Sequence, residues 1–253
     1  MRSIAVLIAF ASAALSQPAS VRIILVGDST MAPKSGYGAG FCADVTAEVT
    51  CLNMAKGGRS TSSYRAEGSW DQVLAELERG SFAASYVLIQ FGHNDQPGKP
   101  GRSTDLATEF PANLRRYVEE VKAAGAQPVL VTSLTRRIFR QGVLTDTLRP
   151  WADATAQVAA EAGVPLLDLH AESMAAVEKM GPAEANTLAM APVPPAIAAD
   201  PANSPNAPKP PADPNAPVFD YTHLGPKGAA YFGAMVAREL GAAVPPLRPY
   251  LKP

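Results

Sequence analysis

The chain has 253 residues, of which 47% are hydrophobic and 7% aromatic, enough for a single domain with a sizeable core. Its 22 lysines and arginines nearly balance 23 aspartates and glutamates, and the formal charge of -1 excludes a basic field that attracts nucleic acid or anionic lipid. No apolar run approaches the roughly 20 residues that a stable membrane span needs. We therefore expect a globular protein with no nucleic-acid partner and no stable membrane span.

Residues 1–20 differ in composition from the rest of the chain. Arg2 supplies a positive start, an apolar stretch covers residues 4–10, and small residues follow. This order is typical of a cleaved secretory signal, with a small-x-small site at Ala14-Leu15-Ser16 or a site closer to Ser20. The alternative is a buried N-terminal helix, although the stretch lacks the polar face of an amphipathic helix. The sequence therefore predicts export through a cleaved signal, to the periplasm or the medium.

Five short runs rich in Val, Ile and Leu recur after this segment, and each is continuously apolar rather than alternating. Such runs are typical of parallel strands that are covered on both faces, and helical patterns separate most of them. The sequence therefore predicts an α/β fold with candidate strands at residues 21–26, 49–54, 86–91, 128–133 and 164–169.

The chain contains two cysteines, Cys42 and Cys51, which are too few and too far apart for a Cys-x-x-Cys zinc site. No structural metal is therefore expected. In an oxidising compartment the pair would close a short disulfide loop beside the first helix. The alternative is two buried thiols that pack as small hydrophobic side chains. The sequence leaves these two interpretations open.

Four helices carry recognisable end signals. Ser69 is the predicted N-cap of a helix that starts at Trp70 and closes at Gly80. The others are predicted at residues 106–124, at residues 151–162, and from Pro226 in a first turn to about residue 241.

Residues 182–217 hold 11 of the 24 prolines. We interpret this stretch as an extended surface insertion, neither helix nor central strand, that interrupts a single domain over residues 21–253. The alternative is a Pro-rich recognition segment.

The first predicted strand ends in Gly27-Asp28-Ser29-Thr30. Sites in open parallel sheets are built at the carboxyl ends of strands, so Ser29 occupies a position suited to a nucleophile. The alternative is an ordinary turn in which Asp28 caps the following helix.

A serine nucleophile needs a base, usually a histidine held by a carboxylate, and the chain has three histidines. His170 follows the fifth strand without a visible partner, and we interpret it as structural or solvated. His93 directly follows the third strand and is a rival. His223 has Asp220 three residues before it, so one turn brings the carboxylate to the ring. The alternative for this pair is a polar helix entrance with Asp220 at the positive end of the helix dipole.

Acyl transfer also needs hydrogen-bond donors for the oxyanion. Gly58 follows the second strand and offers a backbone N–H with no side chain in the way. Asn94 follows the third strand and offers a side-chain amide. The sequence therefore predicts catalytic Ser29, Asp220 and His223, with an oxyanion hole formed by Ser29, Gly58 and Asn94.

These residues resemble the SGNH hydrolases of the GDSL class, whose hallmark Ser, Gly, Asn and His match Ser29, Gly58, Asn94 and His223. Asp220 matches the family's Asp-x-x-His. Longer strings resemble the rhamnogalacturonan acetylesterase branch, namely residues 27–31, 55–64, 67–70 and 90–95. The resemblance implies a three-layer, flavodoxin-like fold with a five-stranded parallel sheet in the order 2-1-3-4-5.

The resemblance also implies a secreted serine esterase that removes acetyl groups from plant cell-wall rhamnogalacturonan, without cofactor or metal. The alternatives are another esterase of the class, such as a xylan acetylesterase, lysophospholipase or thioesterase, and a non-catalytic carbohydrate-binding protein. The Pro-rich stretch departs from the simple family pattern and leads directly to Asp220, which leaves the exact polysaccharide open. We expect a monomer whose partner is an acetylated polysaccharide or another acyl ester.

Four further side chains, Arg59, Tyr64, Arg136 and Arg137, are candidates for contact with an acidic sugar, because arginine pairs well with carboxylates and aromatic rings stack on sugars. Salt bridges or packing are the alternative roles for each of them.

Overall fold

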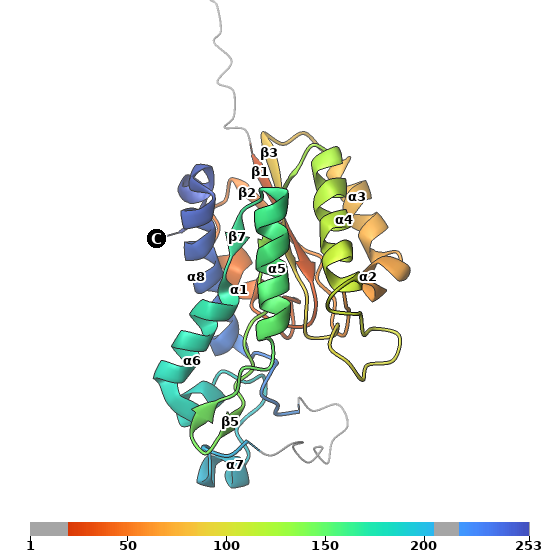
Figure 1. Ribbon diagram of the computed structural model, residues 1–253. Helices are drawn as coiled ribbons and strands as arrows, with labels where there is room; N and C mark the ends of the chain where they lie inside the picture. The colour runs from red at the N-terminus through yellow and green to blue at the C-terminus, as the bar shows by residue number, and fades with distance from the viewer. Residues whose placement is uncertain (1–19, 205–217, 253) are drawn as a thin grey trace, which may run out of the picture.

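The computed structural model describes residues 20–204 and 218–252, so most of the predicted export signal and residues 205–217 of the Pro-rich stretch lie outside the described residues. A five-stranded parallel sheet with the order β2-β1-β3-β4-β7 forms the centre of the molecule (Figure 1). This confirms the predicted sheet and its order. The strands are β1 (Val21–Gly27), β2 (Val49–Asn53), β3 (Ala84–Gln90), β4 (Gln127–Val131) and β7 (Leu166–Leu167).

Helices cover both faces of the sheet, which explains why the strands are apolar without alternation. Ile23 and Leu25 of β1 pack with α1, α6 and α8 on one face, whereas Ile24 and Val26 pack with α2 to α5 on the other. No helix in the described ranges has the length and apolarity to cross a bilayer. The helices are α1 (Gly38–Ala43), α2 (Ser63–Ala66), α3 (Ser69–Leu77), α4 (Glu109–Ala123), α5 (Arg149–Ala162), α6 (Leu169–Asn186), α7 (Pro195–Ala199), α8 (Pro226–Ala243) and the 3₁₀ helix η1 (Pro245–Tyr250).

Two predicted helix starts are shifted. The N-cap of α3 is Gly68, at φ 78°, and Ser69 is the first helical residue, whose hydroxyl contacts Glu67 and Lys56. The helix predicted from residue 106 begins at Glu109. The Asp105 side chain accepts hydrogen bonds from the backbone N–H groups of Ala107 and Thr108, and these bonds hold a turn ahead of the helix.

The prediction of no helix in the Pro-rich stretch is wrong for two segments. Helix α6 consists of two helical segments joined by a kink at Gly181, which has the non-helical angles φ 72° and ψ 168°. The second segment starts at Pro182. Helix α7 starts at Pro195, with Pro194 as its N-cap. Both prolines in these helices stand in a first turn, where a missing N–H costs no hydrogen bond. Ile197 of α7 is buried against Phe219 and Tyr221, so this stretch packs onto the chain just before His223.

The predicted strand over residues 164–169 is the other large difference. Only Leu166–Leu167 pair in the sheet, and α6 starts at Leu169 with the Asp168 side chain as its cap. The structure adds α6, the short α2, and a hairpin formed by β5 (Phe139–Arg140) and β6 (Val143–Leu144), and it gives the first helix, α1, its bounds.

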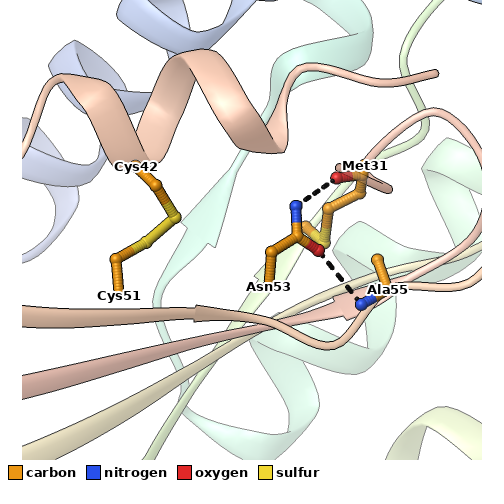
Figure 2. The surroundings of a disulfide bond; sticks show 5 residues. All are labelled: Met31, Cys42, Cys51, Asn53 and Ala55. Carbon is orange, nitrogen blue, oxygen red and sulfur yellow. Dashed lines mark hydrogen bonds between the residues drawn. A yellow bond between two sulfur atoms is a disulfide. The ribbon is translucent and has the colours of Figure 1, made fainter. Parts of the chain in front are cut away.

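A disulfide joins Cys42, in α1, to Cys51, in β2, across nine positions of sequence. Figure 2 shows this bond together with Asn53, two residues further along β2. The Asn53 amide donates to the Met31 carbonyl at 2.9 Å, and its oxygen accepts from the Ala55 N–H at 3.1 Å. The disulfide therefore fixes the strand that also holds the turn after β1.

We expect the double substitution of Cys42 and Cys51 by alanine to lower the free energy of unfolding by about 2 to 3 kcal/mol, since the bond closes a short loop in the unfolded chain. Urea unfolding followed by circular dichroism measures this change. Wild-type protein kept in reductant is the matched control and should reach the stability of the variant. Equal stability of the oxidised wild type and the variant would contradict the expectation.

Candidate active site

The turn after β1 presents Ser29, which is 8% exposed, at the carboxyl end of the central strand. Below it, the Asp28 carboxylate accepts hydrogen bonds from the Thr30 N–H at 2.9 Å and the Thr30 hydroxyl at 2.8 Å. The Gln90 amide at the end of β3 donates to the same hydroxyl at 2.7 Å. Buried hydrogen bonds therefore hold the turn in one conformation and fix the direction of the Ser29 side chain.

The rival histidine, His93, is 3% exposed and lies against the buried Asp28, with 3.5 Å between its Nδ1 and Oδ2 of the carboxylate. Burial lowers the pKa of His93 and favours the neutral ring. Burial alone would raise the pKa of Asp28, but the neighbouring ring and the bonds from Thr30 outweigh it and lower that pKa. His93 is therefore a neutral interior partner of an anionic Asp28, which favours His223 as the base.

Asp220 and His223 are in direct contact ahead of α8. The His223 Nδ1 lies 2.6 Å from Oδ2 of Asp220, and both side chains are about one-third exposed, at 32% and 31%. The other carboxylate oxygen, Oδ1, accepts from the backbone N–H groups of Thr222 at 2.7 Å and His223 at 2.6 Å. Although burial raises the pKa of Asp220, these hydrogen bonds outweigh it and lower the pKa to about 2. The carboxylate is therefore anionic at neutral pH and fixes Nδ1 as the protonated ring nitrogen.

A buried arginine holds the backbone of this turn. The Arg137 guanidinium, which is fully buried, donates from Nη2 to the carbonyls of Asp220 and His223, both at 3.0 Å, and from Nη1 to that of Thr222 at 3.4 Å. Its backbone N–H donates to the Tyr221 carbonyl at 2.8 Å. Burial lowers the pKa of Arg137 to about 10, although the negative charge of Asp220 acts in the opposite direction and raises it. Arg137 therefore supports the Asp-x-x-His turn and has no surface with which to bind a sugar.

Ser35 links the nucleophile turn to the histidine. Its hydroxyl donates to the Ser29 carbonyl at 2.7 Å, and its carbonyl accepts from the N–H of Leu224, the residue after His223, at 2.8 Å. The Ser29 hydroxyl itself has no hydrogen-bond partner within residues 20–204 and 218–252. Hydrogen bonds between nucleophile and base are often loose without substrate, so this geometry is compatible with a serine–histidine pair.

The loop after β2 brings Gly57 and Gly58 beside Ser29. A Cβ atom on Gly57 would lie 3.8 Å from the Ser29 Cβ, and Gly58 has φ +77°, which a side chain would strain. In the described part of the chain, the N–H groups of Ser29 and Gly58 have no hydrogen-bond acceptor. One such donor lies in the turn of Ser29 and the other in the neighbouring loop, and an oxyanion hole requires donors of this kind.

The third predicted donor, Asn94, is 7% exposed, and its Nδ2 donates to the Arg59 carbonyl at 3.0 Å. An amide nitrogen carries two hydrogens, so one remains for an oxyanion. The adjacent Asp95, which the sequence reading passed over, accepts from the N–H and hydroxyl of Thr61 and from the Gly92 N–H. Burial raises the pKa of Asp95 to about 6, although the hydrogen bonds from Thr61 act to lower it. Asn94 and Asp95 thus join the second and third strand-end loops.

The remaining histidine belongs to a separate pair. His170, 1% exposed, lies with its Nε2 2.9 Å from the Asp146 carboxylate and its Nδ1 3.1 Å from the Ser133 carbonyl. These contacts agree with the interpretation of His170 as a structural residue. Its partner Asp146 lies 24 positions earlier in the sequence. No three His, Cys, Asp or Glu side chains in the described ranges are grouped closely enough to hold a metal ion.

Two other sugar-binding candidates have structural roles. The Arg59 guanidinium pairs with Glu67 at 2.7 and 2.8 Å. Tyr64 is fully buried, and its hydroxyl donates to the Met54 carbonyl at 2.7 Å. Arg136 is partly exposed, and its guanidinium donates to the neutral oxygens of Gln96 and Thr147 rather than to a carboxylate.

Comparison with known proteins places this site in context. The sequence profile of the GDSL-like lipase/acylhydrolase family matches residues 25–231. The chain is 34% identical over 239 residues to the rhamnogalacturonan acetylesterase RhgT of Bacillus subtilis strain 168, which covers 91% of this chain and 94% of that protein. It is 28% identical to the probable rhamnogalacturonan acetylesterase YesY of the same organism, over 87% of this chain and 93% of that one.

Solved structures show the same fold at lower identity. The YxiM protein of Bacillus subtilis has a TM-score of 0.67 and 23% identity, over 89% of this chain and 58% of that one, so this chain spans little more than half of it. An acetyl xylan esterase from Geobacillus stearothermophilus has a TM-score of 0.59 and 19% identity, over 87% of this chain and 94% of that one.

Proposed function

The chain belongs to the GDSL-like lipase/acylhydrolase family of carboxylic ester hydrolases, and we propose that it removes acetyl groups from rhamnogalacturonan, the acidic backbone of pectin. Three observations support the chemistry: Ser29 follows β1, the Asp220–His223 pair is in direct contact, and Ser35 links the two turns. Within the described residues, the N–H groups of Ser29 and Gly58 also have no acceptor. The acyl group and the polymer follow from the names of the two relatives that match over nearly the whole chain.

In the proposed mechanism, Nε2 of His223 takes the proton of the Ser29 hydroxyl while Oγ forms a bond to the acetyl carbonyl carbon. The carbonyl oxygen becomes an oxyanion that accepts hydrogen bonds from the N–H groups of Ser29 and Gly58 and from the Asn94 amide. Asp220 stabilises the resulting imidazolium without taking its proton.

Collapse of this intermediate breaks the ester bond to the sugar. His223 returns its proton to the departing sugar oxygen, and the acetyl group stays on Ser29. A water molecule then gives a proton to His223 and attacks the acetyl-serine, and the same oxyanion donors act a second time. Acetate leaves, and Ser29 regains its proton from His223. Each turnover therefore consumes one water and needs no cofactor.

We expect Asn94→Ala to lower kcat by about 10² to 10³-fold with little change in KM, because the donor stabilises charge that exists only in the transition state. Acetate release under saturating substrate measures kcat. The control is Asn113→Ala, since Asn113 also donates a side-chain hydrogen bond to this region, to the Thr61 hydroxyl, but lies on α4. A folded Asn94→Ala enzyme with kcat within threefold of wild type would remove Asn94 from the mechanism.

The substrate is tested by acetate release from acetylated rhamnogalacturonan, acetylated xylan and a short-chain aryl acetate, each with Ser29→Ala as the blank. Release from rhamnogalacturonan that exceeds release from xylan at equal acetyl concentration supports the proposal. Activity on the aryl ester alone would keep the esterase chemistry and discard the pectin assignment. Activity that rises on butyryl and longer esters would favour a lipase or thioesterase.

We also propose that residues 1–20 direct export and are removed. Their charge and hydropathy pattern supports this, as does the Cys42–Cys51 disulfide, because such bonds persist in oxidising compartments. Mass spectrometry of the protein recovered from the periplasm or the medium tests it. A protein that stays in the cytoplasm with Met1 or Arg2 at its start would contradict the proposal.

A further inference from the structure

Three cationic side chains lie beside the proposed oxyanion donors, and we call Lys99, Arg102 and Arg136 the cation cluster. Lys99 Nζ donates to the carbonyl of His93, the residue before Asn94. Arg102 Nη1 lies 3.4 Å from the carbonyl oxygen of Gly58, and the same atom would lie 3.4 Å from a Cβ at Gly58. Two members of the cluster therefore contact the two loops that supply the oxyanion donors.

Arg136 completes the cluster from the loop after β4. Its Nη2 donates to the Gln96 side-chain oxygen at 2.7 Å, and its Nη1 donates to the Thr147 hydroxyl at 2.8 Å. The Gln96 amide in turn donates to the Thr147 carbonyl at 2.7 Å. Neutral oxygens thus orient this guanidinium without cancelling its charge.

No carboxylate in the described residues forms an ion pair with the cluster. Across residues 20–204 and 218–252, neither Lys99, Arg102 nor Arg136 has an Asp or Glu oxygen within 4.0 Å. Burial and the like charges of Arg136 and Arg102 lower the pKa of Lys99, so both arginines lie close enough to act on this lysine. The anions that oppose this repulsion, Asp28 and Asp95, are fully buried.

Other arginines near the site are neutralised. Arg59 pairs with Glu67, and Arg65 makes two hydrogen bonds to Glu120 at 2.8 and 2.9 Å. A group of like charges held together without a counterion raises the local concentration of anions and favours binding of one. The cluster therefore has the electrostatic property of an anion site, whereas the neighbouring loops do not.

The cluster is reachable and its loop is ordered. All three side chains are partly exposed, and Lys99 lines an open hollow of about 340 Å³ with Gly98, Pro100, Gly101 and Ser103. The Ser103 hydroxyl donates to the Gln96 carbonyl at 2.7 Å and accepts from the Lys99 N–H at 2.9 Å. These bonds fix the loop in advance, so binding needs little ordering of the chain.

We propose that the cation cluster is a subsite for a sugar carboxylate, which binds a uronate residue of the polymer next to the acetylated sugar and so selects an acidic over a neutral polysaccharide. Arginine suits this role because its fork of N–H donors matches a carboxylate. This subsite rests on the proposed function, since that function places a galacturonate-containing chain across Ser29.

Arg102 is the most direct position for a test, because within the described residues its side chain makes only one hydrogen bond, the long one to Gly58. The test compares Arg102→Gln with wild type on acetylated rhamnogalacturonan and on the same polymer after chemical reduction of its carboxyl groups. We expect the ratio of kcat/KM on the acidic polymer to that on the reduced polymer to fall at least about tenfold. Arg79→Gln is the charge-matched control at the opposite end of the sheet, after α3, and should leave the ratio unchanged. An unchanged ratio in Arg102→Gln and in Arg102→Gln/Lys99→Gln would overturn the subsite.

A second measurement separates failure of the subsite from failure of the proposed function. Oligogalacturonate, which carries no acetyl group, should inhibit hydrolysis of a neutral aryl acetate by the wild type, and the inhibition constant should rise at least about tenfold in Arg102→Gln. Inhibition of this kind supports the subsite even if acetylated rhamnogalacturonan releases no acetate. A wild-type enzyme that cleaves the aryl ester and is not inhibited by oligogalacturonate refutes the subsite while leaving the esterase intact.

Discussion

Replacing Ser29 by alanine is expected to lower kcat for acetate release by about 10⁵ to 10⁶-fold. The substitution removes the only atom that bonds to the acetyl carbon in the proposed mechanism. It keeps the Ser29 N–H and carbonyl, so the oxyanion donor and the bond from Ser35 remain. Because the hydroxyl has no partner in the described part of the chain, we expect less than about 1 kcal/mol of change in stability.

Two measurements test this expectation. Acetate release gives kcat, and a serine-directed phosphonate, followed by mass spectrometry, should label the wild type and leave the variant unlabelled. Ser81→Ala is the matched control, because Ser81 is an exposed serine before β3, at the other end of the sheet. A folded Ser29→Ala protein that retained activity within tenfold of wild type would remove the serine mechanism altogether.

Asp220→Asn is expected to lower kcat by about 10³ to 10⁴-fold. The reason lies in how the carboxylate is used. Its Oδ1 accepts the N–H groups of Thr222 and His223, so the amide oxygen of an asparagine should take that position. The amide nitrogen then faces Nδ1 of His223 as a donor. The ring must carry its proton on Nε2, the nitrogen that has to accept the proton of Ser29, and the base is blocked.

The second His–Asp pair supplies a matched control. Asp146→Asn makes the same change beside His170 and should leave kcat near that of wild type, even if it costs stability. Equal losses in the two variants would mean that Asp220 acts only through folding. Because the pKa of Asp220 is about 2, its charge is present throughout pH 4 to 8.

The same pKa has a consequence for stability. A carboxyl group whose pKa is lowered by folding stabilises the native state above its unfolded pKa, and this contribution disappears as the pH falls through the folded value. The stability difference between wild type and Asp220→Asn should therefore be full at pH 5 and shrink between about pH 4 and pH 2. Urea midpoints measured at intervals of half a pH unit follow this change.

The sequence alone determined the sheet and the family. Strands such as β1 and β3 carry apolar residues on both faces because helices cover both faces of the sheet, and this pattern is visible without the tertiary structure. The hallmark residues lie at strand ends or at a helix entrance, where local motifs are readable. The matches to the family profile and to the two rhamnogalacturonan acetylesterases confirm the resemblance. The triad and oxyanion assignments remain predictions that the substitutions above test.

Only the tertiary structure decided which side chains support the site. Arg136 and Arg137 are neighbours in sequence, yet one is a partly exposed cation and the other is buried under a turn 86 positions away. Lys99 and Arg102 carry no motif, and their meaning comes from the loops beside them. Local patterns record which residues are apolar or lie in turns. They do not record partners distant in sequence, and in this protein the charges around the site are set by such partners.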